Sequence, residues 1–78
     1  MDEREIIVRG VLWVFGADGG IRPGEFAENL IRAFGYANKR EFTQLAMGFP
    51  EYANIVTAYR KGTLDKKYFE KVKENNQP

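Results

Sequence analysis

Glu25 and Glu28 are the residues of this chain whose type and spacing come closest to a catalytic or metal-binding pair. Carboxylates three residues apart share one face of a helix, where they could share a proton or hold a cation. Acidic side chains at this spacing also suit the first turn of a helix, because they interact favourably with the helix dipole. We adopt the second interpretation, so the sequence predicts no catalytic residue and no metal ligand.

The composition restricts other catalytic chemistry, because the chain has no His, no Cys and no Ser. The hydroxyls of Thr43, Thr57 and Thr63 therefore have no imidazole to activate them as nucleophiles. The glycines from Gly16 to Gly20 lack the Lys and Ser/Thr that a phosphate-binding P-loop requires. We expect a protein that is not an enzyme and that needs no cofactor.

Aromatic and basic side chains are the remaining functional candidates. Protein interfaces favour Trp, Tyr, Phe and Arg. The candidates for a protein interface are Trp13, Arg22, Tyr36, Tyr52 and Tyr59. The candidates for a nucleic-acid interface are Asn54, Arg60, Lys61, Lys66 and Lys67. The formal net charge is +1, so the total charge by itself does not indicate attraction to nucleic acid or membrane.

Helices are the elements that must position these side chains, because apolar residues recur at helical spacing along the chain. We expect the first helix from Asp2 or Glu3 to Gly16, the second from Pro23 to Gly35, the third from Asn38 to Pro50, the fourth from Pro50 to Gly62 and the fifth from Thr63. No alternating strand pair is evident. The sequence therefore predicts an all-α, compact bundle of four or five short helices, with residues 1–74 as a single domain and 75–78 as a frayed tail.

Several positions in this bundle carry specific expectations. Gly10 should allow the close approach of a neighbouring helix, and Gly19 and Gly20 should supply positive φ angles for a chain reversal. Pro23 should lie in the first turn of the second helix. Phe26 and Phe49 should be core residues; alternatively, the corners Pro23-Gly24 and Phe49-Pro50 sit together and expose an aromatic surface to a partner.

A set of short motifs between residues 21 and 59 resembles a known group of proteins. The motifs are Pro23-Gly24-Glu25-Phe26, Leu30 with Ala33, Ala37-Asn38, Leu45-Ala46 and Phe49-Pro50-Glu51. In these the chain is similar to small uncharacterised helical proteins of tailed phages and prophages. The resemblance implies a small helical phage protein and gives no function.

A weaker resemblance links the third and fourth helices to phage repressor helix-turn-helix domains. It rests on Gln44-Leu45-Ala46 and on Val56 followed by Tyr59-Arg60-Lys61-Gly62. Pro50 stands where such domains have the turn glycine. The would-be recognition face from Tyr52 to Thr57 has no basic residue, although base and phosphate contacts favour such residues.

We therefore expect a small phage-type accessory protein that binds and modulates or inhibits a host defence or regulatory protein. A DNA-binding regulator and a minor virion or assembly component are the alternatives. The apolar run Val11–Phe15 is too short to span a bilayer, and the chain begins with acidic residues, so we expect a cytoplasmic location in the host and no membrane partner. The same run could be covered by a second copy in a homodimer or inside the monomer.

Overall fold

The computed structural model describes residues 2–64 of the 78-residue chain. Within this range the chain forms four helices and no strand: α1 (Glu3–Val14), α2 (Glu25–Tyr36), α3 (Lys39–Gly48) and α4 (Pro50–Arg60). The all-α prediction is confirmed. The fifth helix expected from Thr63, the tail at 75–78 and the candidates Lys66 and Lys67 lie outside the described residues.

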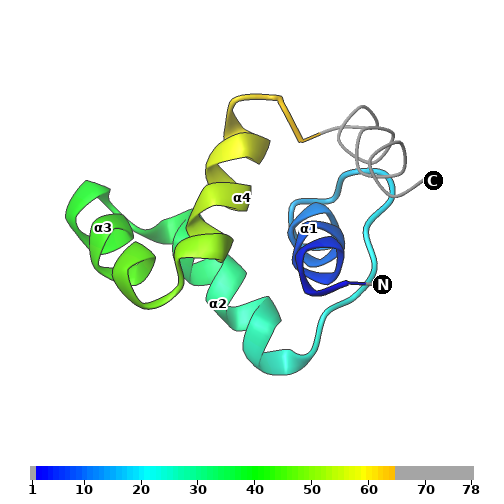
Figure 1. Ribbon diagram of the computed structural model, residues 1–78, viewed down its shortest axis with the longest axis horizontal. Coiled ribbons are helices and arrows are strands. Elements are labelled where there is room, and N and C mark those ends of the chain that lie inside the picture. The colour runs from blue at the N-terminus through cyan, green and yellow to red at the C-terminus, as the bar shows by residue number, and fades with distance from the viewer. Residues whose placement is uncertain (1, 65–78) are drawn as a thin grey trace.

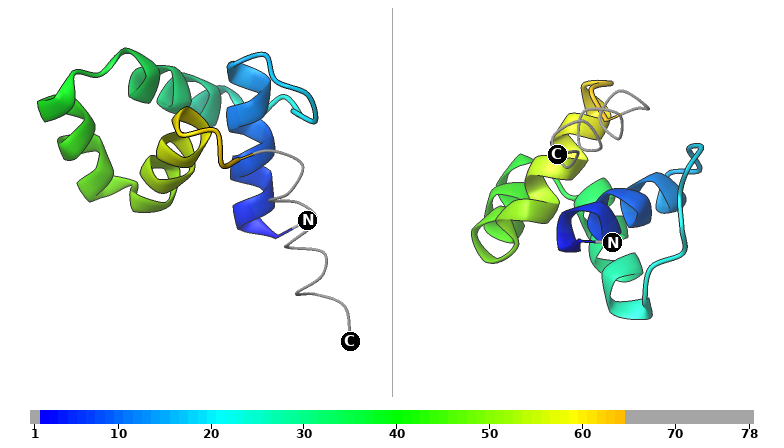
Figure 2. Two further views of the ribbon diagram at one scale, coloured as in Figure 1. Left: turned by 90° about the horizontal axis from the view of Figure 1, so that it is seen from above. Right: turned by 45° about the vertical axis from the view of Figure 1, so that its right-hand side comes forward.

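The helices are arranged around α2 and α4 (Figure 1). α1 packs on α2 and α4, α2 packs on α4, and α3 packs on α4. Figure 2 shows α3 on the opposite side of α4 from α1. α3 is therefore an outer helix, attached mainly to α4.

The hydrophobic core forms where α1, α2 and α4 meet. Its buried side chains are Ile7, Val8, Val11, Leu12, Leu30, Ile31, Phe34, Ala53, Ile55, Val56 and Leu64. α3 contributes no fully buried residue and packs against the core with the half-buried Phe42, Leu45 and Ala46. Edge-to-face contact between the Phe34 and Phe42 rings, with centroids 5.2 Å apart, joins α3 to the core.

The apolar first helix is covered in part within the single chain. Ile7, Val8, Val11 and Leu12 are each at most 5% exposed. In the run Val11–Phe15, Val11 and Leu12 are thus buried inside the monomer, whereas the other three residues are half-buried. A homodimer stays a prediction, and it would have to use other side chains.

The segment between α1 and α2 passes across one side of α1 on its way to α2 (Figure 1), and it departs from expectation at Gly20. Gly19 has the expected positive φ of 88°, whereas Gly20 does not. A Cβ on Gly20 would lie 2.5 Å from Trp13 Cα, so this position requires glycine for close approach rather than for its φ angle. Hydrogen bonds from Ile21 N to Arg9 O (3.1 Å) and from Arg9 Nη1 to Gly19 O (2.8 Å) hold the segment on α1.

The start of α2 also differs from the prediction. Pro23 was expected in the first turn, which is wrong, because α2 begins at Glu25 with Gly24 as its extended N-cap. Pro23 instead lies against α1, where a Cβ added to Gly10 would be 3.2 Å from Pro23 Cβ and 3.3 Å from Ile31 Cδ1 of α2. The close approach expected at Gly10 is thus confirmed. α2 continues through Gly35 and ends at Tyr36.

Candidate protein-binding groove

A groove separates α2 from α3, because both helices pack on α4 while diverging from each other. Its volume is about 640 Å³, and its lining residues are Ala33, Tyr36, Ala37, Glu41, Gln44, Leu45, Gly48 and Phe49. Ala33, Ala37 and Gly48 are small, so they leave space that larger side chains would fill. We call this feature the α2–α3 groove.

Two interactions fix the angle at which α3 leaves α2. Asn38 caps α3, with its Oδ1 accepting a hydrogen bond from Glu41 N at 2.8 Å while Glu41 Oε1 accepts one from Asn38 N at 2.9 Å. Arg60 of α4 donates from Nη2 to the carbonyl oxygens of Phe34 (3.1 Å) and Gly35 (3.4 Å) in the last turn of α2. The expected N-cap at Asn38 is confirmed, and it belongs to a complete capping box.

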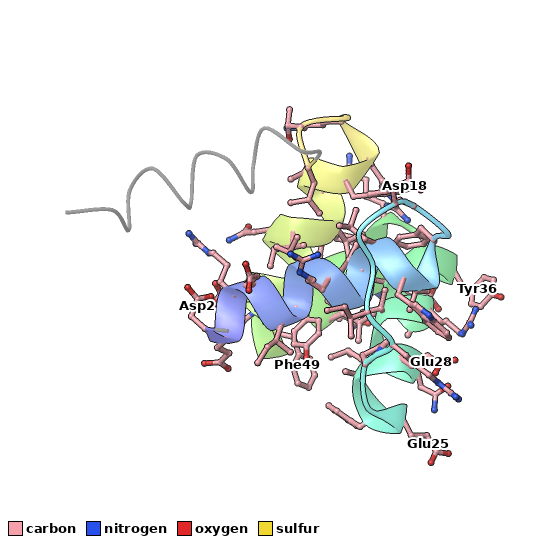
Figure 3. The ribbon with its side chains drawn as sticks, turned by 90° about the vertical axis from the view of Figure 1, so that its right-hand side faces the viewer. Asp2, Asp18, Glu25, Glu28, Tyr36 and Phe49 are labelled. Carbon is pink, nitrogen blue, oxygen red and sulfur yellow. The ribbon has the colours of Figure 1, made fainter. Side chains whose placement is uncertain are left out.

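Exposed apolar side chains border this groove. Tyr36 lines the groove at the end of α2 and is 84% exposed. Phe26, at the start of α2, is 68% exposed and its ring lies beside that of the groove residue Phe49. Met47 of α3 is 83% exposed but does not line the groove. Figure 3 shows Tyr36 projecting away from the helices. Large apolar side chains at such exposure around one groove are typical of a binding surface.

Phe26 was expected in the core, and this prediction is wrong. It lies at the first turn of α2, beyond the end of the core that α1 and α4 cover, so it stays in solvent. Its ring meets that of Phe49, with centroids 6.0 Å apart, and Phe49 in turn meets Tyr52 edge-on at 6.2 Å. The two corners therefore come together, as the alternative interpretation expected.

The five candidates for a protein interface do not form one surface. Tyr36 lines the α2–α3 groove, and Tyr52 is half-buried beside Phe49. Trp13 and Arg22 lie together, with the Arg22 guanidinium carbon 5.6 Å from the Trp13 ring centroid. Tyr59 is half-buried and stacks on Phe15 with centroids 5.0 Å apart.

The described candidates for nucleic-acid binding are all on α4 or directly after it. Asn54, Arg60 and Lys61 are exposed. The Arg60 guanidinium is held in place, because it donates a hydrogen bond to Phe34 O of α2 and its carbon lies 5.4 Å from the centroid of the Phe42 ring. The structure brings Arg60 and Lys61 to one pocket, with Lys39, which the sequence did not single out.

The two carboxylates considered first, Glu25 and Glu28, have different surroundings. Glu28 forms ion pairs with Arg32 at 3.1 Å and with Arg22 at 3.6 Å, whereas Glu25 is exposed (Figure 3). Among residues 2–64 no group of three or more acidic side chains gathers in a way that could hold a metal ion. No helix in that range is long and apolar enough to cross a membrane.

Of the residues that line the groove, the sequence singled out Tyr36 as an interface candidate and did not single out Ala33, Ala37, Glu41, Gln44, Leu45 or Gly48. One signal was available in the sequence. Phe26, Ala33 and Tyr36 share one face of α2, and the small Ala33 between the two aromatic residues leaves space on that face.

The chain matches no protein-family model, no curated protein and no solved structure.

Proposed function

We propose that this chain is a small non-enzymatic binding protein that docks a partner protein in the α2–α3 groove. The observation that carries the proposal is the groove itself, with small residues in its lining, Tyr36 exposed at its edge and Phe26 exposed beside Phe49. Keeping the Phe26 and Tyr36 rings in water has a free-energy cost that a partner's apolar surface would remove. The partner is expected to present an apolar helix face, a common occupant of a groove between two helices.

The mode of action that suits such a protein is occlusion. A domain of 78 residues that covers a site on a larger protein can block or redirect that protein without any chemistry of its own. In line with the phage-protein resemblance, the partner is a defence or regulatory protein of the host, and the chain acts in the host cytoplasm as its modulator or inhibitor.

The DNA-binding and assembly alternatives have less support. Before Arg60, the exposed residues of α4 include a single side chain suited to reading bases, Asn54, and no basic residue. A virion or assembly role would need extensive self-association, whereas Ile7, Val8, Val11 and Leu12 of α1 are already buried inside the monomer.

A capture experiment with matched variants tests the proposed groove. The tagged wild type, Ala33→Arg and Ile21→Arg are each incubated with a nuclease-treated lysate of a bacterial host, and retained proteins are quantified by mass spectrometry. Ala33→Arg places a long charged side chain in the groove. Ile21→Arg is the control, because Ile21 is 47% exposed on the segment that follows α1, away from the groove.

The expected result is that Ala33→Arg reduces capture of a specific protein about tenfold or more, the range of an interface hot spot, while Ile21→Arg retains it. Circular dichroism on each variant checks that the helices remain folded. Equal capture by wild type and Ala33→Arg would rule out the groove as the docking site. Retention that is lost on nuclease treatment would favour the DNA-binding alternative.

A further inference from the structure

A second hollow, distinct from the α2–α3 groove, lies where the start of α3 meets the end of α4. Its volume is about 490 Å³, and it is lined by Ala37, Asn38, Lys39, Phe42, Thr43, Thr57, Arg60 and Lys61. Three of these residues are cations and none is a carboxylate. We call it the basic pocket.

Among residues 2–64 no carboxylate neutralises the charges of Lys39 and Lys61 in the basic pocket. Lys39 and Lys61 form no ion pair with any residue from 2 to 64. Glu41, the acidic residue closest in sequence to Lys39, lines the α2–α3 groove instead, where its Oε1 accepts a hydrogen bond from Asn38 N. Three cations around one hollow repel one another, and a bound anion would relieve that repulsion.

Arg60 is held in a fixed position beside this pocket. Both of its hydrogen bonds to α2 use Nη2, so Nε and Nη1 keep N–H groups for another acceptor. The contact with the Phe42 ring restrains the guanidinium further. A restrained guanidinium with free donors is well suited to an anion with several oxygens, because little side-chain entropy is lost on binding.

A purely structural role explains Arg60 but not Lys39. Arg60 satisfies carbonyl oxygens at the C-terminal end of α2, where a cation is stabilising. Lys39 is the first residue of α3, where a positive charge opposes the helix dipole and lowers stability. An anion in the pocket would turn this unfavourable charge into a favourable one, and it would also face the N-terminal end of α3.

We propose that the basic pocket binds a phosphate group, through Lys39, Arg60 and Lys61 with the Thr57 hydroxyl as a further donor. The Thr43 hydroxyl donates to Lys39 O at 3.0 Å and is left with acceptor capacity only. This site is independent of the proposed groove, although the two share Ala37 in their linings. The phosphate could belong to a nucleic-acid backbone or be free in solution.

The test is a titration of the ¹⁵N-labelled protein with inorganic phosphate at low ionic strength, followed by backbone amide shifts. The variants are Lys39→Glu, Lys61→Glu and the control Arg40→Glu. Lys39 and Arg40 are adjacent exposed residues in the first turn of α3. Reversing the charge of either residue therefore changes the net charge by the same amount and has a similar effect on the interaction with the helix dipole. Only Lys39 lines the pocket.

We expect saturable shifts centred on Lys39, Thr57, Arg60 and Lys61. Lys39→Glu and Lys61→Glu should each weaken phosphate binding about tenfold or more, as for loss of a charge-assisted hydrogen bond, and Arg40→Glu should weaken it by less than about threefold. Shifts that do not saturate, or equal losses in Lys39→Glu and Arg40→Glu, would overturn the proposal. A parallel titration with a short DNA duplex identifies the source: binding that fails in Lys39→Glu but not in Arg40→Glu indicates a nucleic-acid backbone, and phosphate binding without duplex binding indicates a free phosphate.

Discussion

Tyr52 shows how the fold changes the chemistry of a single residue. Its ring is half-buried against Phe49, and burial raises the pKa of its phenol above the ordinary value of 10.0; the nearby negative charge of Glu3 raises it further. Both causes disfavour the phenolate. The folded chain therefore holds the Tyr52 proton more tightly than the unfolded chain does.

This difference predicts a pH dependence of stability in alkali. Because the folded-state pKa is the higher one, the contribution of neutral Tyr52 is present below pH 10 and is lost as the pH rises through the folded-state pKa. Thermal unfolding followed between about pH 8 and pH 11 should show a fall in the free energy of unfolding that is smaller in Tyr52→Phe. A Tyr52→Phe variant with the same alkaline slope as the wild type would contradict this account.

The helix α3 depends on its N-terminal cap more than the other helices do. It has no fully buried residue, and it packs with half-buried side chains on one side only. The capping box of Asn38 and Glu41 satisfies two backbone N–H groups that would otherwise have no protein partner. The cap therefore supports the helix that forms one wall of both the groove and the basic pocket.

Removal of this cap should weaken the whole domain by a measurable amount. Asn38→Ala is expected to lower the free energy of unfolding by about 1 kcal/mol in urea denaturation, the usual loss for an N-cap side chain. Glu41→Gln is the control, because glutamine at this position still accepts a hydrogen bond from the N-cap backbone. An Asn38→Ala variant as stable as the control would show that tertiary packing alone holds α3.

At the scale of the whole molecule, the contact of the α1–α2 segment with the side of α1 determines where α2 can pack. Gly20 lies directly on the α1 backbone, where an added Cβ would overlap Trp13 N and lie 2.9 Å from Leu12 C. Backbone atoms cannot move aside as a flexible side chain can. A residue larger than glycine would therefore push the segment off α1 and disturb the placement of α2.

Gly20→Ala is accordingly expected to destabilise the protein by about 1–3 kcal/mol, as overpacked sites do. Gly48→Ala is the matched control, because a Cβ at Gly48 meets nothing within 4 Å and alanine favours the helix. Thermal and urea denaturation of both variants measure the difference. Equal stability of the two variants would contradict the close approach of Gly20 to α1.

The residues of the α2–α3 groove divide into those that the sequence indicated and those that it did not. Tyr36 was indicated, because aromatic residues are favoured at interfaces. Phe49 was expected in the core, and only the alternative in which the two corners meet brought it to a binding surface. Phe26 was assigned to the core, because its spacing from Leu30 matches a helical stripe whose other members are buried. Periodicity reports the direction of a side chain, but not how far along a helix the neighbouring helices extend.

Local patterns in the sequence determined the four described helices, their caps at Asp2 and Asn38, the proline start of α4 and the identity of most core residues. These features depend on residues a few positions apart, so they can be read along the chain. Only the tertiary structure decided that α2 and α3 diverge, that Phe26 stays in solvent, that Gly20 lies on Trp13, and that Lys39 joins Arg60 and Lys61 in one pocket. The physical reason is that each of these features joins residues distant in the chain, and their meeting is set by the angles at which α2, α3 and α4 pack.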